Sequence, residues 1–398
     1  MIILVLEETY PWYRGGVSEW VSHYLGAFPG QTFSLLQLTT TPGEVPCRKP
    51  IYRLPDHVRG SFRLPVPVAR GGELPADDAW ASRALASLPD RALRGARLVH
   101  VLNTGFAGLL GRALASAKEL PLVLTEHALY RKEAMAGEHA LECGFELPVA
   151  ERARRRMARW FRNSARKIYR SSHRVISVSR CNMPNQRDLG ARDPIYIPNG
   201  VDASWLLERK VRSGRPTLGW IGRCAGLKDP LRFFRVMEQM DDEWRGLMML
   251  SSAGEGELEE RVRTEGEDNG RLCLVWDRPA REHIDQMDAL CITSRSESQP
   301  LVLFEGLARR VLPAGWRVGD VGPPFALTVP KGSPPWTLAG RINRLWKEQS
   351  CWERALDSRR ELLEKEHTWE AVFGRYRNVL EPWLDGSSPG PEGGAFSR

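Results

Sequence analysis

The chain has 398 residues, of which 42% are hydrophobic and 9% aromatic, enough for substantial cores and more typical of two domains than of one. No run of about 18 apolar residues indicates a membrane span, and Met1 leads directly into an apolar segment without the basic start of a signal peptide, so we expect a cytoplasmic protein. The formal net charge of +8 favours an anionic partner. That partner could be an anionic substrate, an acidic membrane or nucleic acid.

Short apolar runs alternate with longer segments of helical pattern along the chain. They predict buried parallel strands at residues 2–6, 32–38, 98–102, 122–124 and 175–178, and again at 217–221, 246–251, 272–276 and 289–293. Residues 41–80 are rich in Pro, Gly and Arg without periodicity and predict irregular loops. Pro198-Asn199-Gly200 has the composition of a hinge. We therefore predict two α/β domains joined near residue 200, with the cleft between them as the expected site.

Paired glycines follow the first predicted strand and come just before a predicted helix. The N–H groups of Gly15 and Gly16 can face a phosphate there with help from the helix dipole, and Trp12 can stack on a sugar. An ordinary strand-to-helix turn is the alternative. The spacing is not the six-residue glycine fingerprint of a dinucleotide site, which argues against a nicotinamide enzyme.

Two further features belong to the first half. His127 follows the predicted strand at 122–124, and we favour a role near a bound ligand over a purely structural one. Residues 151–170 carry nine Arg or Lys and one Glu. In a first interpretation they form a surface helix that is attracted to an anionic partner, either acidic lipid or an anionic acceptor. In a second they form a solvated helix whose apolar side packs on its own domain. We favour the second interpretation.

The second half carries two cations and a glycine turn after its first strands. Arg223 and Lys228 are five residues apart at the end of the strand predicted at 217–221, a spacing that suits a diphosphate and the charge that grows on it when it leaves. Gly254 lies in a glycine turn after the next strand. It can line the same crevice, although a plain loop explains it equally well.

The segment at 296–305, SESQPLVLFE, places Glu297 before a tight turn and Glu305 within the following predicted helix. The turn Gln299-Pro300-Leu301-Val302 opens that helix and so offers backbone N–H groups to phosphate. The two carboxylates can accept hydrogen bonds from sugar and ribose hydroxyls. Alone, the pair is also compatible with a solvated helix face; the histidine, the cations and the glycines at other strand ends favour a donor site.

These motifs, in this order, resemble the retaining GT-B glycosyltransferases of family four, and residues 7–20, EETYPWYRGGVSEW, are similar to the Pel-polysaccharide (PelF-like) branch. The resemblance implies an α/β chain of two Rossmann-like domains facing a deep interdomain cleft. The acceptor domain would span 1–199 and the nucleotide-sugar domain 200–368. A C-terminal helix at 369–385 would cross back to the first domain, and residues 386–398, which have almost no apolar content, are expected to be a disordered tail.

The resemblance also implies a retaining, metal-independent transfer of a hexose from a UDP-sugar to an acceptor that the sequence does not identify. Its expected catalytic residues are His127 at the sugar ring, Glu297 at the sugar hydroxyls, and Arg223 and Lys228 at the diphosphate. The residues expected to bind the nucleotide sugar are Gly15, Gly16, Gly254, Gln299, Pro300, Leu301, Val302 and Glu305, with Glu305 at the ribose.

The expected partners are the nucleotide-sugar donor and the acceptor, with no metal, no further cofactor and no nucleic acid. Peripheral contact with an anionic membrane at its inner face stays open. Two alternatives keep the same site: a GDP-mannose-dependent mannosyltransferase, and a noncatalytic sugar-nucleotide-binding assembly subunit. Arg310 and Asp277 occupy positions where the family commonly has glycine.

Overall fold

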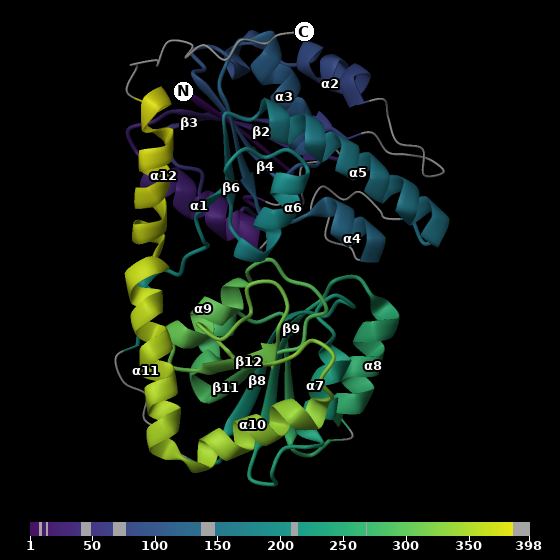
Figure 1. Ribbon diagram of the computed structural model, residues 1–398, viewed down its shortest axis with the longest axis vertical. Helices are drawn as coiled ribbons and strands as arrows, with labels where there is room; N and C mark the ends of the chain where they lie inside the picture. Colours follow the sequence, from purple (N-terminus) through teal and green to yellow (C-terminus); the bar gives the residue numbers. More distant parts are fainter. Residues whose placement is uncertain are drawn as a thin grey trace. The chain divides into compact units, whose positions relative to one another are not determined.

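A computed structural model of the chain describes residues 1–7, 10–12, 15–40, 49–66, 77–136, 148–207, 214–267 and 269–384. The chain divides into two compact units, each with its own parallel sheet (Figure 1). Unit 1 comprises Met1–Val178, Asn182–Ile197 and Phe373–Arg398; unit 2 comprises Ser179–Cys181 and Pro198–Val372. The tail predicted at 386–398 lies outside the described residues.

Unit 1 is built on a seven-stranded sheet in the order β3-β2-β1-β4-β5-β6-β7, in which every neighbouring pair is parallel. The strands are β1 (Ile2–Glu7), β2 (Phe33–Thr39), β3 (Val58–Pro65), β4 (Leu98–Leu102), β5 (Leu122–Glu126), β6 (Arg174–Ser177) and β7 (Ile195–Tyr196). All residues of β1 are buried, as expected for a central strand covered on both faces. The strand order reverses between β1 and β4, which makes their carboxyl ends a natural place for a site.

The helices of unit 1 are α1 (Gly16–Ala27), α2 (Asp77–Ala86), α3 (Phe106–Ala117), α4 (Tyr130–Ala136), α5 (Glu151–Ser171), α6 (Met183–Asp188) and most of α12 (Trp369–Leu384). The strands predicted between residues 2 and 178 are confirmed. The expectation of irregular loops over 41–80 was wrong in two places, because β3 and the start of α2 fall within it. β3 pairs on one side only, and Arg59, Gly60 and Arg63 interrupt its apolar residues, so it lacks the period of a buried strand.

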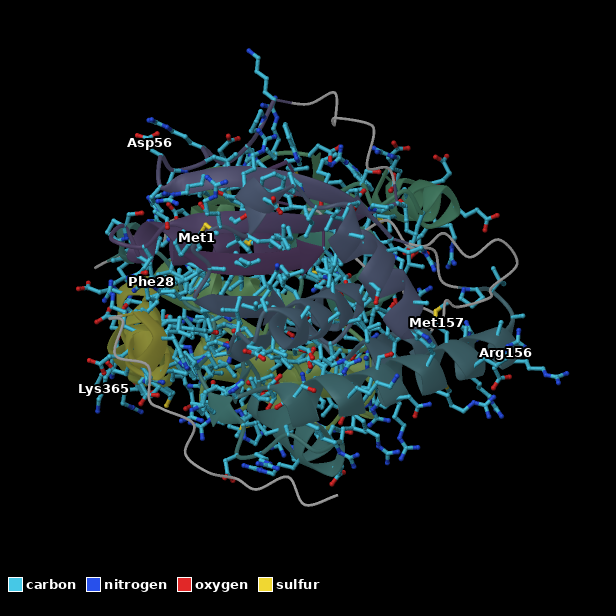
Figure 2. All side chains as sticks on the ribbon, turned by 90° about the horizontal axis from the view of Figure 1, so that it is seen from above. Met1, Phe28, Asp56, Arg156, Met157 and Lys365 are labelled. Carbon is cyan, nitrogen blue, oxygen red and sulfur yellow. The ribbon has the colours of Figure 1, made fainter. Side chains whose placement is uncertain are left out.

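Helix α5 has two sharply different sides. Met157, Phe161 and Ile168 are buried in the core of unit 1, whereas most of its arginines are exposed on the opposite side. In Figure 2 the side chain of Arg156 extends outward from this helix. The interpretation in which the apolar side packs on its own domain is therefore confirmed.

Unit 2 contains a six-stranded parallel sheet in the order β10-β9-β8-β11-β12-β13. Its strands are β8 (Thr217–Arg223), β9 (Arg245–Ser251), β10 (Leu272–Trp276), β11 (Ala289–Ile292), β12 (Leu312–Trp316) and β13 (Leu327–Val329). Its helices are α7 (Pro230–Met237), α8 (Gly256–Glu267), α9 (Leu301–Ala308), α10 (Pro335–Lys347) and α11 (Gln349–Glu366). The order again reverses between two central strands, here β8 and β11.

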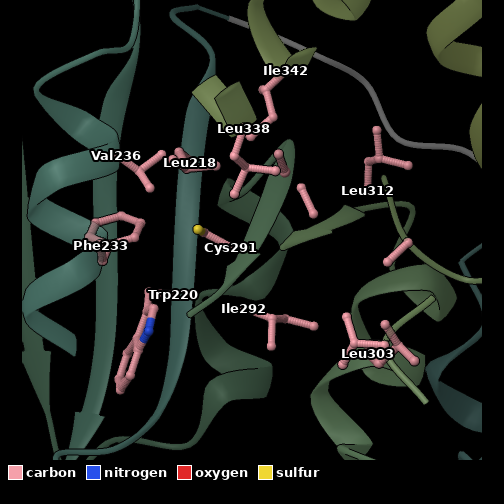
Figure 3. Close-up of a cluster of buried hydrophobic side chains, with 14 of the residues drawn as sticks. Leu218, Trp220, Phe233, Val236, Cys291, Ile292, Leu303, Leu312, Leu338 and Ile342 are labelled. Carbon is pink, nitrogen blue, oxygen red and sulfur yellow. The ribbon is translucent and has the colours of Figure 1, made fainter. Parts of the chain in front are cut away.

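The core of unit 2 joins its sheet to α7, α9 and α10. Trp220 of β8, Phe233 of α7, Cys291 of β11, Leu303 of α9 and Leu338 of α10 belong to one buried cluster (Figure 3). Burial raises the pKa of the Cys291 thiol to about 12, so this cysteine packs as a neutral, largely apolar side chain. The packing fixes β8 and β11, whose carboxyl ends carry the residues discussed below.

Helix α12 begins in unit 2 and joins unit 1 from Phe373 onward. The rings of Phe373 and Tyr376 pack against Trp20 and Tyr24 of α1, and the Thr125 hydroxyl donates to the Tyr376 hydroxyl at 3.3 Å. This last helix therefore contributes to the core of unit 1. Within the described ranges, no helix combines the length and apolar character needed to cross a bilayer.

Candidate functional site

An ion pair lies at the carboxyl ends of β8 and β11, where the strand order of unit 2 reverses. Lys228 Nζ donates to Glu297 Oε1 at 2.5 Å, and the two side chains are 23% and 10% exposed. Lys228 follows β8 and Glu297 follows β11, and these strands are neighbours. The fold therefore brings together two of the residues that the sequence placed in one donor site. Such crevices at reversal points are the usual ligand sites of open parallel sheets.

Both members of this pair line a small cavity in unit 2, together with Trp220, Ile221, Leu290, Cys291, Ile292, Thr293, Ser294 and Val302. Thr293 holds one wall in place: its hydroxyl accepts from Trp220 Nε1 at 2.8 Å and donates to the backbone oxygen of Lys228 at 2.7 Å. The buried indole and hydroxyl thus fix the backbone of Lys228. A charged group held this way is well placed to meet a ligand with little reorganisation.

Gln299 anchors the turn that opens α9. Its Oε1 accepts from the Asn199 N–H at 2.6 Å, and its Nε2 donates to Asp320 Oδ2 at 3.2 Å, so this buried side chain supports the loop from within. Pro300 is the N-cap residue of α9. The N–H groups of Leu301 and Val302 then occupy the first helical turn, where an α-helix has no internal acceptors for them.

Glu305 lies one turn into α9 and is half-buried. Arg223, the last residue of β8, is exposed; across the described residues, no hydrogen bond or ion pair of its guanidinium is found. Its loop is held elsewhere, because the Gly226 N–H donates to Glu255 Oε2 at 3.0 Å. Arg223 is therefore available to a ligand, while the loop that carries it is fixed.

Gly254 has an internal partner that the sequence did not indicate. Its N–H donates at 3.1 Å to Glu259 Oε1, which also accepts from the Ala253 N–H at 2.9 Å and from the Ser252 hydroxyl at 2.7 Å. The bond from Ser252 is the main reason that the pKa of the Glu259 carboxyl is lowered. The φ of +78° at Gly254 suits glycine, so the turn is explained by its own capping carboxylate.

The sequence missed Gly319 and Asp320 as parts of this site. A Cβ added at Gly319, where φ is +56°, would lie 2.0 Å from the backbone oxygen of Glu297, so the chain passes directly over that residue. Asp320 accepts from Gln299 and also from the Ser179 hydroxyl at 2.9 Å and the Cys181 N–H at 3.2 Å. Burial raises the pKa of its carboxyl.

The remaining predicted residues belong to unit 1. Gly15 is the N-cap residue of α1 and Gly16 its first residue; both are exposed. The Glu19 N–H donates to the Gly15 oxygen at 2.9 Å, which closes the first turn. Tyr13 and Arg14, just before them, lie outside the described residues.

His127 follows β5 and is 9% exposed. Its backbone N–H donates to Asn103 Oδ1 at 2.8 Å, and its ring lies edge-on to Trp20 with 5.2 Å between ring centroids. Burial lowers the pKa of the imidazole to about 3, so the ring is neutral near pH 7. Within the described part of the chain, Nε2 has no hydrogen-bond partner. A buried nitrogen without a partner is costly unless a ligand or water satisfies it.

Unit 1 also contains two buried carboxylates that were not among the predicted site residues. Glu7 ends β1 and Glu126 ends β5. The hydroxyl of Tyr130 donates to Glu7 Oε2 and that of Tyr169 to Glu126 Oε2, each at 2.6 Å. Burial raises the pKa of Glu126 to about 7, although hydrogen bonds from Tyr169 and Thr104 oppose the shift. A carboxylate as the last residue of an apolar strand was the available signal.

Comparison with known proteins agrees with this architecture. A family model described as a domain of unknown function (DUF3492) matches residues 1–66 and 79–194. No curated protein matches the chain. Sucrose-phosphate synthase from Thermosynechococcus elongatus superposes with a TM-score of 0.72 at 18% identity, covering 96% of this chain and 99% of that one.

Two further solved structures cover the same share of each chain. Anabaena HepE in complex with UDP and glucose gives a TM-score of 0.68 at 13% identity, with 96% of this chain and 99% of HepE covered. The apo form of the lipopolysaccharide outer core galactosyltransferase WaaB gives 0.62 at 12% identity, again with 96% and 99% covered. The predicted fold class is therefore confirmed: the chain has two parallel-sheet, Rossmann-like domains matching the GT-B glycosyltransferases.

Proposed function

We propose that the protein is a retaining, metal-independent glycosyltransferase that moves a hexose from a UDP-sugar to an acceptor. The observation that carries the proposal is the Lys228–Glu297 pair at the reversal point of the unit 2 sheet, next to the first turn of α9. A cation, a carboxylate and helix N–H groups in one place match the phosphates and hydroxyls of a nucleotide sugar. The GT-B fold supports the assignment by analogy, because fold alone does not fix activity.

Arg223 and Lys228 bind the donor diphosphate in this proposal. The Lys228 ammonium has three N–H groups, and the hydrogen bond to Glu297 uses one of them. Two N–H groups remain for phosphate oxygens, and Arg223 adds its fork from the end of β8. The N–H groups of Leu301 and Val302 complete the phosphate contacts, and Glu305 accepts from the ribose.

Glu297 accepts hydrogen bonds from the hydroxyls of the transferred sugar, and the resemblance assigns His127 to the sugar ring. In the reaction, the bond between the anomeric carbon and the phosphate oxygen breaks, and a bond to the acceptor oxygen forms on the same face. The acceptor proton passes to the departing diphosphate. Arg223 and Lys228 offset the charge that develops there, which is why the proposal needs no metal ion.

UDP is proposed as the nucleotide because HepE, a protein of the same fold, is seen with UDP and with UDP-glucose. A GDP-mannose donor would use the same cations. The two are separated by competition: UDP should inhibit donor turnover at lower concentration than GDP.

Arg223→Ala tests the diphosphate assignment. We expect nucleoside diphosphate release from the UDP-sugar to fall at least about tenfold, because a charge-assisted bond to the leaving group is lost. Arg235→Ala is the matched control, since Arg235 is exposed on α7 and pairs with Glu238. If Arg223→Ala releases nucleoside diphosphate at the same rate as the wild type, Arg223 does not bind the diphosphate.

A further inference from the structure

An open pocket of about 500 Å³ lies between α4 and α5 in unit 1. Five arginines line it, together with Met135 and Ala158: Arg131, Arg152, Arg155, Arg159 and Arg162. Among the described residues that line it, none is acidic. The donor site described above uses none of these residues.

The four arginines of α5 follow one another at intervals of three, four and three residues, which places them along one side of the helix. With a rise of about 1.5 Å per residue, the stripe from Arg152 to Arg162 is about 15 Å long. Its direction is fixed, because Met157 and Phe161 are buried in the core. Figure 2 shows α5 with Arg156 extending away from it.

Arg131 comes from α4 and makes the site more than a charged helix face. It is half-buried and donates to Asn185 Oδ1, while its Nε has no hydrogen-bond partner within the described part of the chain. Glu151 pairs with Arg155 at 2.6 Å, but this pair is exposed and contributes little. Among the described residues that line the pocket, five cations come from two helices and no acidic side chain lies between them, an arrangement that favours binding of an anion.

The ligand chemistry follows from the side chains. The cations among the described lining residues are all arginines, and the guanidinium fork binds tetrahedral phosphate oxygens through paired hydrogen bonds. A stripe about 15 Å long exceeds what one phosphate group can contact. We propose that this pocket is a binding site for a ligand that carries several phosphate groups, either free in solution or displayed by lipid headgroups. This proposed binding site is separate from the donor site, and the proposal does not depend on glycosyl transfer.

Binding to the full chain is measured by calorimetry with inorganic tripolyphosphate, and by co-sedimentation with phosphatidylcholine vesicles with and without phosphatidic acid. The pocket variant is Arg155→Gln/Arg159→Gln. The control is Arg156→Gln/Lys167→Gln, which removes the same charge from exposed positions of α5 that do not line the pocket.

We expect the pocket variant to lose at least about tenfold in affinity, and the control less than about threefold. Selective loss of tripolyphosphate binding supports a soluble ligand; selective loss of vesicle binding supports a headgroup. The proposal is overturned if neither probe binds, or if both variants weaken binding equally. The proposal is also overturned if citrate binds with the same affinity as tripolyphosphate. It is overturned in favour of a nucleic-acid ligand if a single-stranded oligonucleotide binds more tightly than tripolyphosphate.

Discussion

The ammonium of Lys228 lies 2.5 Å from the carboxylate of Glu297, and neither side chain is freely exposed. Each residue follows a different central strand of unit 2, so the contact depends on the parallel pairing of β8 with β11. Removing either partner leaves the other largely buried without its counter-charge, a more costly state than a broken surface pair.

Lys228→Met should therefore weaken UDP binding about tenfold or more and leave the weaker binding of uridine unchanged, because uridine has no diphosphate. Calorimetric titration of both ligands measures the difference. Lys347→Met is the control: Lys347 pairs with Asp241 at 2.8 Å, and both side chains are exposed. If the two variants bind UDP with the same affinity, Lys228 does not contact the diphosphate.

Gly319→Ala should disturb Glu297 without touching its side chain. The added Cβ would overlap the Glu297 backbone oxygen, and alanine disfavours the φ of +56°. We expect the free energy of unfolding to fall by about 2 kcal/mol or more and donor turnover to drop. Gly332→Ala is the control, since no atom lies within 4 Å of its added Cβ. A Gly319→Ala protein with wild-type stability would contradict the close approach.

Glu126 should make stability depend on pH. Its pKa is about 7 in the folded protein against an ordinary value of 4.5, so the folded state holds a proton that the unfolded chain releases. Stability from this group is then lost as the pH rises from about 4.5 to about 7, by up to roughly 3 kcal/mol. Denaturant unfolding at several pH values should show a smaller decline in Glu126→Gln than in the wild type. Glu257→Gln, at an exposed position, should leave the decline intact.

His127 should remain neutral well below the ordinary pKa of histidine. Burial holds its pKa near 3, so 15N NMR of labelled histidine should show a neutral ring at pH 5. Addition of a UDP-sugar should shift the Nε2 resonance, because that nitrogen has no partner within the described chain. A signal of the charged imidazolium at pH 5 would contradict the burial of this ring.

The sequence predicted the central strands well because both faces of a parallel sheet are covered, which leaves a continuous apolar run such as residues 2–6. The edge strand β3 was missed for the opposite reason: it has one neighbour, and two arginines interrupt it. Lys228 and Glu297 could be placed together because carboxyl ends of neighbouring parallel strands meet at one sheet edge.

Long-range partners could not be predicted. Nothing near Asp320 in sequence shows that it accepts from Gln299, 21 residues away. Arg310 and Asp277 occupy positions where glycine is common in the family that the sequence resembles. With φ values of +57° and +55°, both residues adopt the backbone conformation that glycine favours.

The most direct test of the central claim is the release of UDP from a panel of UDP-sugars, followed by mass spectrometry, with GDP-mannose as the competing donor. We predict release from at least one UDP-sugar by the wild type, and loss of release in Glu297→Ala and in Arg223→Ala/Lys228→Met, with Gly332→Ala unaffected. UDP release that persists in the substituted proteins would contradict this function. So would a wild-type protein that binds UDP-sugars but turns over neither UDP-sugars nor GDP-mannose with any acceptor preparation.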